Sequence, residues 1–169
     1  MMTRHQSRQE AFCLLFEKSF SDMTLEEIIE GATETRDLQP NEFTMQLAQG
    51  TVDHVEELDA LIEPKLKNWK LSRISKVSLA ILRMAAYELM YVPQVPINVT
   101  VDEAVELAKK FGGDESPSFV NGILAKFAGK AAGRTGGEAE ADKPAGSAAN
   151  PEAVSPSPEE PEKTGTEKA

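Results

Sequence analysis

Residues 72–91, SRISKVSLAILRMAAYELMY, form the most apolar segment of this 169-residue chain. Apolar side chains recur in it at intervals of three or four residues, the spacing that places them on one face of an α-helix. The line consists of Ile74, Val77, Ile81, Ala85 and Leu89, and Leu82, Ala86 and Met90 widen it. A face this wide is typical of a helix that is buried on most sides at the centre of a helical domain.

The segments around this central helix carry weaker helical patterns. Thr24 and Thr100 each precede a glutamate by three residues, the arrangement of a capping box at a helix start. Gly50 lies inside a long amphipathic segment, where glycine costs about 1 kcal/mol relative to alanine, so we expect another helix to approach it closely. Further helices are predicted at about residues 4–20, from 24 onward, 42–62, 100–111 and from 116 onward. Since no strand-length alternating segments are present, the chain is expected to be all-α, with six or seven helices in two antiparallel groups.

The last part of the chain has a different composition. Residues 130–169 are rich in Ala, Gly, Pro, Ser and Glu, and Val154 is their only large apolar side chain. Such a segment buries too little apolar surface to offset the entropy of ordering. We therefore expect a folded domain at 1–129 and a disordered tail at 130–169, and we favour a solvating role for the tail over an interaction role.

Charge and cysteine content limit the kinds of partner. The net charge is −10, and residues 1–128 alone carry 13 Lys+Arg against 20 Asp+Glu, so an RNA site must be a local basic patch or be completed by a basic partner. No apolar run is long enough to span a membrane, and the polar N-terminus does not resemble a secretory signal. Cys13 lies between Phe12 and Leu14, which favours a buried, unreactive thiol. These features together favour the cytoplasm.

No group of residues predicts catalysis or a bound metal. His5 and His54 are the only histidines, and neither has neighbouring cysteines to complete a metal site. Adjacent glutamates such as Glu56 and Glu57 fit a solvated helix face better than an acid–base pair. We therefore expect a protein that is not an enzyme and that needs no cofactor.

The start of the first predicted helix carries a small basic set, Arg4, His5 and Arg8. Arg4 and Arg8 lie four residues apart on one helical face, at the positive end of the helix dipole, and could grip two successive phosphates. A solubilising helix start is the alternative interpretation. Near the other end of the domain, Phe119 and Val120 cannot both face the core, and an exposed phenylalanine can stack on an RNA base.

Several blocks of the sequence, in this order and spacing, resemble the NusB family of bacterial transcription antitermination proteins. They are TRHQSRQEAFCLLF at 3–16, WKLSRISKV at 69–77, ILRMAAYEL at 81–89, VPINVTVDEAVELAKKFGG at 95–113 and SPSFVNGIL at 116–124. The resemblance implies an all-helical fold of two subdomains. It also implies binding to the boxA element of ribosomal RNA leader transcripts, together with the ribosomal protein NusE. Such a complex joins RNA polymerase and other Nus factors, and it suppresses premature termination.

The same resemblance suggests site residues by position. Those expected on the RNA face are Arg4, His5, Arg8, Arg83 and Phe119. Those expected on the side of NusE are Phe16, Ser78 and Glu88, and Glu115 lies in a loop that the family associates with antitermination. A basic ribosomal partner would reconcile the acidic domain with RNA binding, because the acidic faces would meet the partner and the basic patch would meet the RNA.

Two other functions compete with this interpretation. A homodimeric or protein-binding helical scaffold without RNA contact is favoured by the thin basic patch, since His5 and Gln6 stand where the family commonly has arginine or lysine. The intact block at 95–124 weighs against it. An enzyme is the third option, because NusB-like domains also occur fused to RNA cytosine methyltransferases. That function requires a cofactor-binding α/β domain, which the tail is too short to supply.

Overall fold

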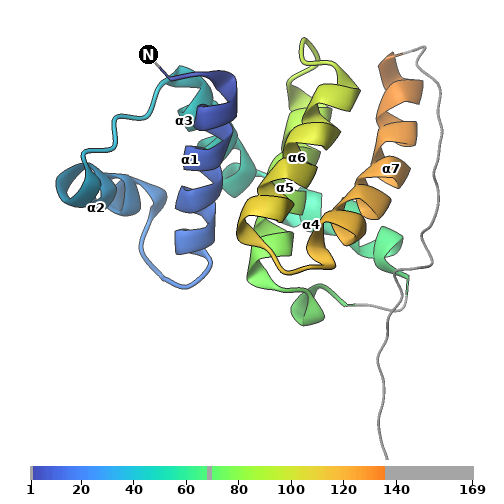
Figure 1. The fold of residues 1–169 in the computed structure, drawn as a ribbon, viewed down its shortest axis with the longest axis horizontal. Coiled ribbons are helices and arrows are strands. Elements are labelled where there is room, and N and C mark those ends of the chain that lie inside the picture. Colours follow the sequence, from blue (N-terminus) through green and yellow to red (C-terminus); the bar gives the residue numbers. More distant parts are fainter. Residues whose placement is uncertain (1, 68–69, 136–169) are drawn as a thin grey trace, which may run out of the picture.

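The computed structural model describes residues 2–67 and 70–135, with side chains described up to residue 127 (Figure 1). These ranges contain seven α-helices, two short 3-10 helices and no strand, which confirms the all-α prediction. The elements are α1 (Arg4–Lys18), α2 (Leu25–Arg36), α3 (Glu42–Asp53), α4 (Val55–Ile62), η1 (Glu63–Leu66), η2 (Leu71–Arg73), α5 (Lys76–Tyr91), α6 (Ile97–Phe111) and α7 (Ser116–Thr135).

The helices form two groups that share α5. In the first group α1 packs against α2 and α3, and in the second α5, α6 and α7 pack against one another with α4 alongside (Figure 1). Helix α5 contacts α1, α3, α4, α6 and α7. Ile81, Leu82 and Met84 on this helix are almost completely buried. The expected central helix and the two subdomains are therefore confirmed.

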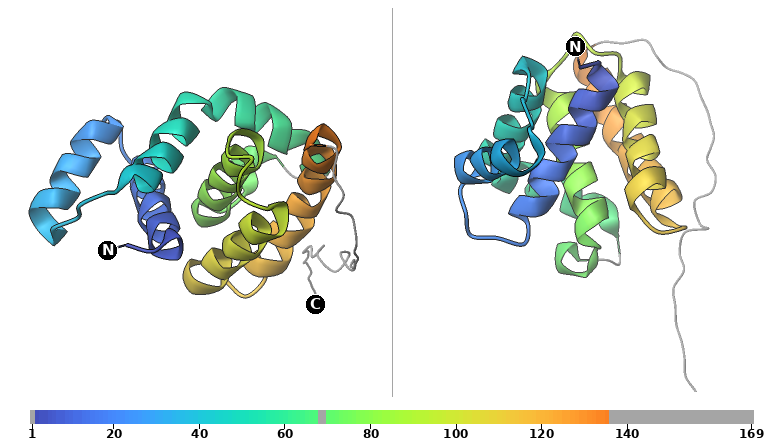
Figure 2. Two further views of the ribbon diagram at one scale, coloured as in Figure 1. Left: turned by 90° about the horizontal axis from the view of Figure 1, so that it is seen from above. Right: turned by 60° about the vertical axis from the view of Figure 1, so that its left-hand side comes forward.

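The segment predicted as one helix over 42–62 is two helices. Helix α3 ends at Asp53, and His54 has φ −114° and ψ 18°, outside the helical region. Its Nδ1 donates to the carbonyl oxygen of Gly50 at 2.8 Å, and its ring lies 4.4 Å from that of Tyr91, centroid to centroid. Helix α4 then continues in a new direction, and the left view of Figure 2 shows α3 and α4 as a bent line joining the two groups.

Gly50 lies where α3 packs against α5. A methyl group added at its Cα would overlap the ring of Tyr87, a buried residue of α5. The expected close approach of another helix at Gly50 is therefore confirmed. The two helix groups meet here because the position lacks a side chain.

The start of α6 differs from the expected one. The helix begins at Ile97, with Pro96 as its N-cap, and the Thr100 amide already donates to the carbonyl oxygen of Pro96 at 3.2 Å. Proline fixes φ near the value that a helix start requires, so the backbone turns three residues earlier than the threonine signal suggests. Thr100 is consequently buried inside the helix rather than capping it.

Replacing Thr100 with valine is expected to stabilise the domain by about 1 kcal/mol. The Thr100 hydroxyl has no hydrogen-bond partner within the described part of the chain, and valine has nearly the same shape without the buried polar atom. Thr51→Val is the matched control, because the buried Thr51 hydroxyl donates to the carbonyl oxygen of Leu47 at 2.6 Å. Urea denaturation of both variants should show opposite signs, and a loss of stability in Thr100→Val would contradict the argument.

Helix α7 continues to Thr135, so the expected domain boundary at residue 129 falls inside a helix. The rest of the expected disordered tail, 136–169, and the tryptophan of the second family block, Trp69, lie outside the described residues. The assignment of the tail as disordered stays a prediction.

Candidate nucleic-acid and partner interface

Arg4 and His5 lie exposed on the first turn of α1. Thr3 caps this helix: its hydroxyl accepts from the Gln6 amide, and the Gln6 side chain accepts from the Thr3 amide. The Arg4 guanidinium carbon stands 4.0 Å from the centroid of the Phe43 ring, a cation–π distance. His5 Nδ1 lies 2.7 Å from a carboxylate oxygen of Glu103 on α6. Both side chains are thus held in place while remaining open to solvent.

Arg8 does not lie on the surface, so the expected phosphate contact by Arg8 is wrong for this structure. Its side chain is 4% exposed and that of Glu88 on α5 is 1% exposed. Arg8 Nε donates to Glu88 Oε1 at 3.0 Å and Nη2 donates to Oε2 at 2.5 Å. Arg8 and Arg4 do share a helical face, but one turn further along α1 that face meets α5. Glu88 was expected on the side of the partner protein, but its carboxylate is buried in this ion pair with Arg8.

Arg83 is separated from the N-terminal basic residues. Its Nε and Nη2 donate to the two carboxylate oxygens of Asp59 at 2.7 and 2.8 Å, which ties α5 to α4. It lines a cavity beside Lys18, the last residue of α1, whereas Arg4 is the first residue of that helix. The expected grouping of Arg83 with Arg4 and His5 is therefore not formed.

Three of the expected residues gather at the start of α7. Glu115 is exposed in the loop before the helix, and Phe119 is half-buried against the core. Val120 is completely buried, which answers which of the two neighbouring residues faces the core. Ser78 is buried and its hydroxyl lies 2.8 Å from that of Ser116, so it joins α5 to α7 instead of offering a surface contact.

Phe16 belongs to a row of aromatic rings that follows α1 and continues just past its end. Its ring centroid lies 5.7 Å from that of Phe12 and 4.9 Å from that of Phe20, and Phe12 lies 4.8 Å from Phe111 on α6. Phe20 is 64% exposed. The rings form one side of an open groove that is completed by Cys13, Glu17, Arg36 and Val77. Most of this groove is apolar, with one acidic and one basic residue at its rim.

Three findings bear on other kinds of site. Burial raises the pKa of the Cys13 thiol above its ordinary value, which disfavours the reactive thiolate. Within the described ranges, no set of three or more His, Cys, Asp or Glu side chains is placed to hold a metal ion. None of the described helices combines the length and apolarity that a membrane span requires.

Most of the chain, residues 5–129, matches the sequence model of the NusB family. The chain belongs to the NusB family. The transcription antitermination protein NusB of Exiguobacterium sp. is 46% identical over 123 residues, which cover 73% of this chain and 94% of the relative. The protein of the same name from Bacillus subtilis is 44% identical over 126 residues, covering 75% of this chain and 95% of the relative.

Solved NusB structures share the fold. T. maritima NusB has a TM-score of 0.70 at 36% identity, with 77% of this chain and 94% of that chain covered. A structure of the antitermination factors NusB and NusE in complex with dsRNA has a TM-score of 0.68 at 24% identity, covering 76% of this chain and 99% of that chain. At 24% identity, the similarity to the NusB chain of this complex shows only that the two share a fold.

In this NusB-family chain the sequence interpretation missed several residues beside the expected ones. Phe20 continues the line Phe12–Phe16 at a spacing of four, a signal that could have extended the aromatic row. Phe111 was missed because it is the last residue of α6, directly before Gly112, where the sequence indicated only the end of a helix. The role of Glu103 as the partner of His5 had no local signal, because 98 residues separate the two.

Proposed function

We propose that this protein is a transcription antitermination factor that binds the boxA RNA of ribosomal RNA leader transcripts together with NusE, and that helps RNA polymerase avoid premature termination. It acts as an adaptor without catalysis, in the cytoplasm, alongside other Nus factors. The observation that carries the proposal is the family match over 5–129, which spans nearly the whole domain described. Relatives with more than 40% identity bear the name of that function.

The RNA face is proposed to include Arg4, His5 and Phe119. Arg4 and His5 stand at the positive end of α1, where phosphate is favoured by the helix dipole as well as by the side chains. Phe119 is half-buried, so one part of its ring is available for stacking on a base. Arg8 supports this face from below, since its ion pair with Glu88 fixes α1 against α5.

The aromatic groove is the proposed contact for NusE. An exposed apolar surface with a polar rim is typical of a protein interface, and Phe20 and Phe16 provide such a surface. Ser78 and Glu88 are buried, so they support the interface only by positioning the helices around it. Glu115 is exposed and can contact NusE directly. In the solved complex named above, a NusB chain of the same fold is bound to NusE and dsRNA.

Fluorescence anisotropy of labelled boxA RNA, titrated with the protein at fixed salt, tests the proposal. Binding is expected, with tighter binding when purified NusE is present, and both should be lost when the boxA sequence is scrambled. Binding of NusE without any binding of RNA would instead support a protein-binding scaffold. Absence of both, with circular dichroism showing a folded helical protein, would reject the proposed function.

The substitution Arg4→Glu is expected to weaken boxA binding about tenfold and to reduce its dependence on salt. Arg4 is exposed and its only close contact described is the Phe43 ring, so the free energy of unfolding should change little. Lys109→Glu changes the same charge on an exposed lysine of α6 and serves as control. Equal weakening by both variants would show that net charge, and not this patch, governs binding.

A further inference from the structure

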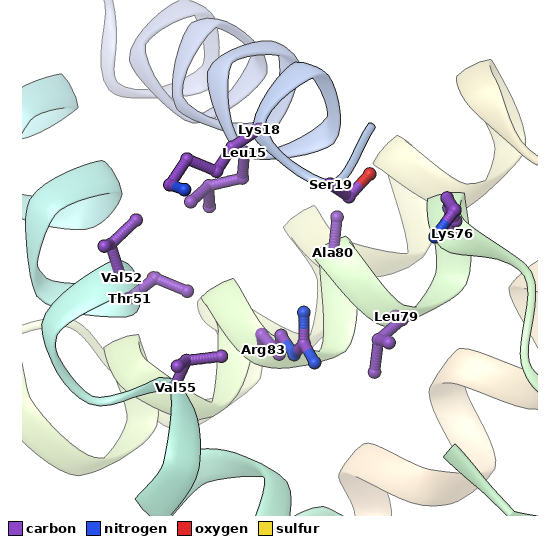
Figure 3. Close-up of a pocket in the computed structure, with 10 residues that line it drawn as sticks. All are labelled: Leu15, Lys18, Ser19, Thr51, Val52, Val55, Lys76, Leu79, Ala80 and Arg83. Atoms are coloured by element: carbon purple, nitrogen blue, oxygen red, sulfur yellow. The ribbon is translucent and has the colours of Figure 1, made fainter. Parts of the chain in front are cut away.

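A cavity of about 350 Å³ lies between the end of α1, the last turn of α3 and the first half of α5 (Figure 3). Volumes of roughly 300–1,000 Å³ are typical of sites for small molecules. The cavity is at the opposite end of α1 from Arg4, about 20 Å away along the helix. It is therefore separate from the proposed RNA face, and the aromatic groove has different lining residues.

The lining combines apolar walls with positive charge. The apolar walls are formed by Leu15, Val52, Val55, Leu79 and Ala80. Three of the ten lining residues, Lys18, Lys76 and Arg83, are cationic, and none is acidic. In a chain with a net charge of −10, a cavity whose charged lining residues are all cationic departs from the average surface, and Asp59 beside the lining is paired with Arg83. Such an arrangement favours a ligand with both an apolar part and negative charge.

The cations are arranged around one space. Figure 3 shows Arg83 reaching into the space below α1, with Lys18 and Lys76 on either side of it. Arg83 is fixed by Asp59 through Nε and Nη2, which leaves Nη1 outside that ion pair. Lys18 and Lys76 have no carboxylate within ion-pair distance in the described part of the chain. Lys76 Nζ lies 5.4 Å from the centroid of the Phe20 ring, at the border between this cavity and the aromatic groove.

Helix ends of both signs meet at the cavity: the negative ends of α1 and α3 and the positive ends of α4 and α5. The positive charge of the cavity therefore comes mainly from its side chains. Lys76 is the first residue of α5 and Ser75 is its N-cap, so the positive end of the helix dipole lies at the cavity. The hydroxyls of Ser19 and Thr51 already donate to the carbonyl oxygens of Phe16 and Leu47. Their protons are engaged, so an anion here would be held by the two lysines and Arg83.

We propose that this cavity binds the phosphate group of a nucleotide-sized ligand, with the apolar walls accepting its base or sugar. Phosphate suits the site because it can accept from several cations at once. The inference depends on the lining residues and not on the RNA role proposed above. The phosphate could belong to a free nucleotide or to an RNA strand, and the experiment separates these sources.

The test is a calorimetric titration of the full chain with ADP at fixed ionic strength. Saturable binding at one site is expected, and Lys18→Gln and Lys76→Gln should each weaken it about tenfold. Lys109→Gln is the matched control, because Lys109 is an exposed lysine on α6, away from the cavity, and it should leave ADP affinity unchanged. Amide chemical shifts of Ser19, Thr51 and Ala80 should move on ADP binding.

Labelled boxA RNA provides the second arm. If Lys18→Gln and Lys76→Gln also weaken RNA binding and ADP competes with RNA, the cavity holds an RNA phosphate. If RNA affinity is unchanged while ADP binding is lost, the cavity is a separate nucleotide site. The inference is overturned if ADP does not saturate at about 10 mM and the variants leave RNA affinity unchanged, or if Lys109→Gln has the same effect as the cavity variants.

Discussion

Replacing Glu88 with alanine is expected to lower the free energy of unfolding by about 3–5 kcal/mol, the usual cost of removing one partner from a buried ion pair. The variant would leave the Arg8 guanidinium in the interior without its carboxylate, since Arg8 is almost completely buried. The three hydrogen bonds from Arg8 Nε and Nη2 to Glu88 would be lost with it. Glu103 lies 4.0 Å from Arg8 Nη1, which is within ion-pair distance but too far for a hydrogen bond, so it would compensate the charge only in part.

Urea denaturation should be carried out beside two controls. The double variant Arg8→Met with Glu88→Leu removes both charges and is expected to lie within about 2 kcal/mol of the original protein. Glu106→Ala, which removes the exposed partner of Lys109, should change stability by less than about 1 kcal/mol. A loss below 1 kcal/mol for Glu88→Ala would mean that water reaches Arg8, and that the residue is available to RNA after all.

This ion pair also decides how the RNA face can be tested. Reversing the charges of Arg4 and Arg8 together would place a glutamate beside Glu88 in the interior. Loss of RNA binding would then reflect unfolding as readily as loss of a phosphate contact. Arg4→Glu alone avoids this problem, because the side chain of Arg4 is exposed.

The second large effect is expected at Gly50. Gly50→Ala should destabilise the domain by about 1–3 kcal/mol, because the new methyl group would overlap the buried Tyr87 ring where α3 meets α5. That ring has little freedom to move, since it is buried and packs against the rings of His54 and Tyr91, at 5.7 and 5.1 Å between centroids. The overlap is therefore expected to outweigh the gain in helix propensity of up to about 1 kcal/mol.

Gly31→Ala is the control for this experiment. Gly31 lies within α2, and a methyl group there would meet no atom of the described structure within 4 Å. The same substitution should therefore stabilise the protein by about 0.5–1 kcal/mol. Thermal or urea unfolding should show opposite signs for the two glycines. A stabilising Gly50→Ala would indicate that Tyr87 can rotate away, and that the two helix groups are less tightly joined here.

Local patterns predicted most of the helices correctly. Helix α5 follows from the three-and-four spacing of its apolar residues, and Thr24 does cap α2 by accepting from the Glu27 amide. The glycines at 112 and 113 follow the end of α6 as expected. These predictions succeed because each depends on residues within a few positions of one another.

Predictions about the surface were less accurate. Arg8 was expected to face phosphate and Glu88 to face a partner protein, yet each is the buried partner of the other across 80 residues of sequence. The break at His54 was not predicted either, and its ring packs against Tyr87 and Tyr91 of another helix. Phe119 and Val120 were equivalent candidates for the core until the direction of α7 was known.

The sequence by itself determined the helical class, the central position of residues 72–91 and the NusB resemblance, because periodicity and ordered motifs are properties of the chain alone. Only the tertiary structure decided which charges remain in solvent. Burial of an ionisable side chain depends on the partner that compensates it, and these partners come from distant helices. The exposed Arg4, the buried Arg8 and the cation-lined cavity around Arg83 are therefore outcomes of packing.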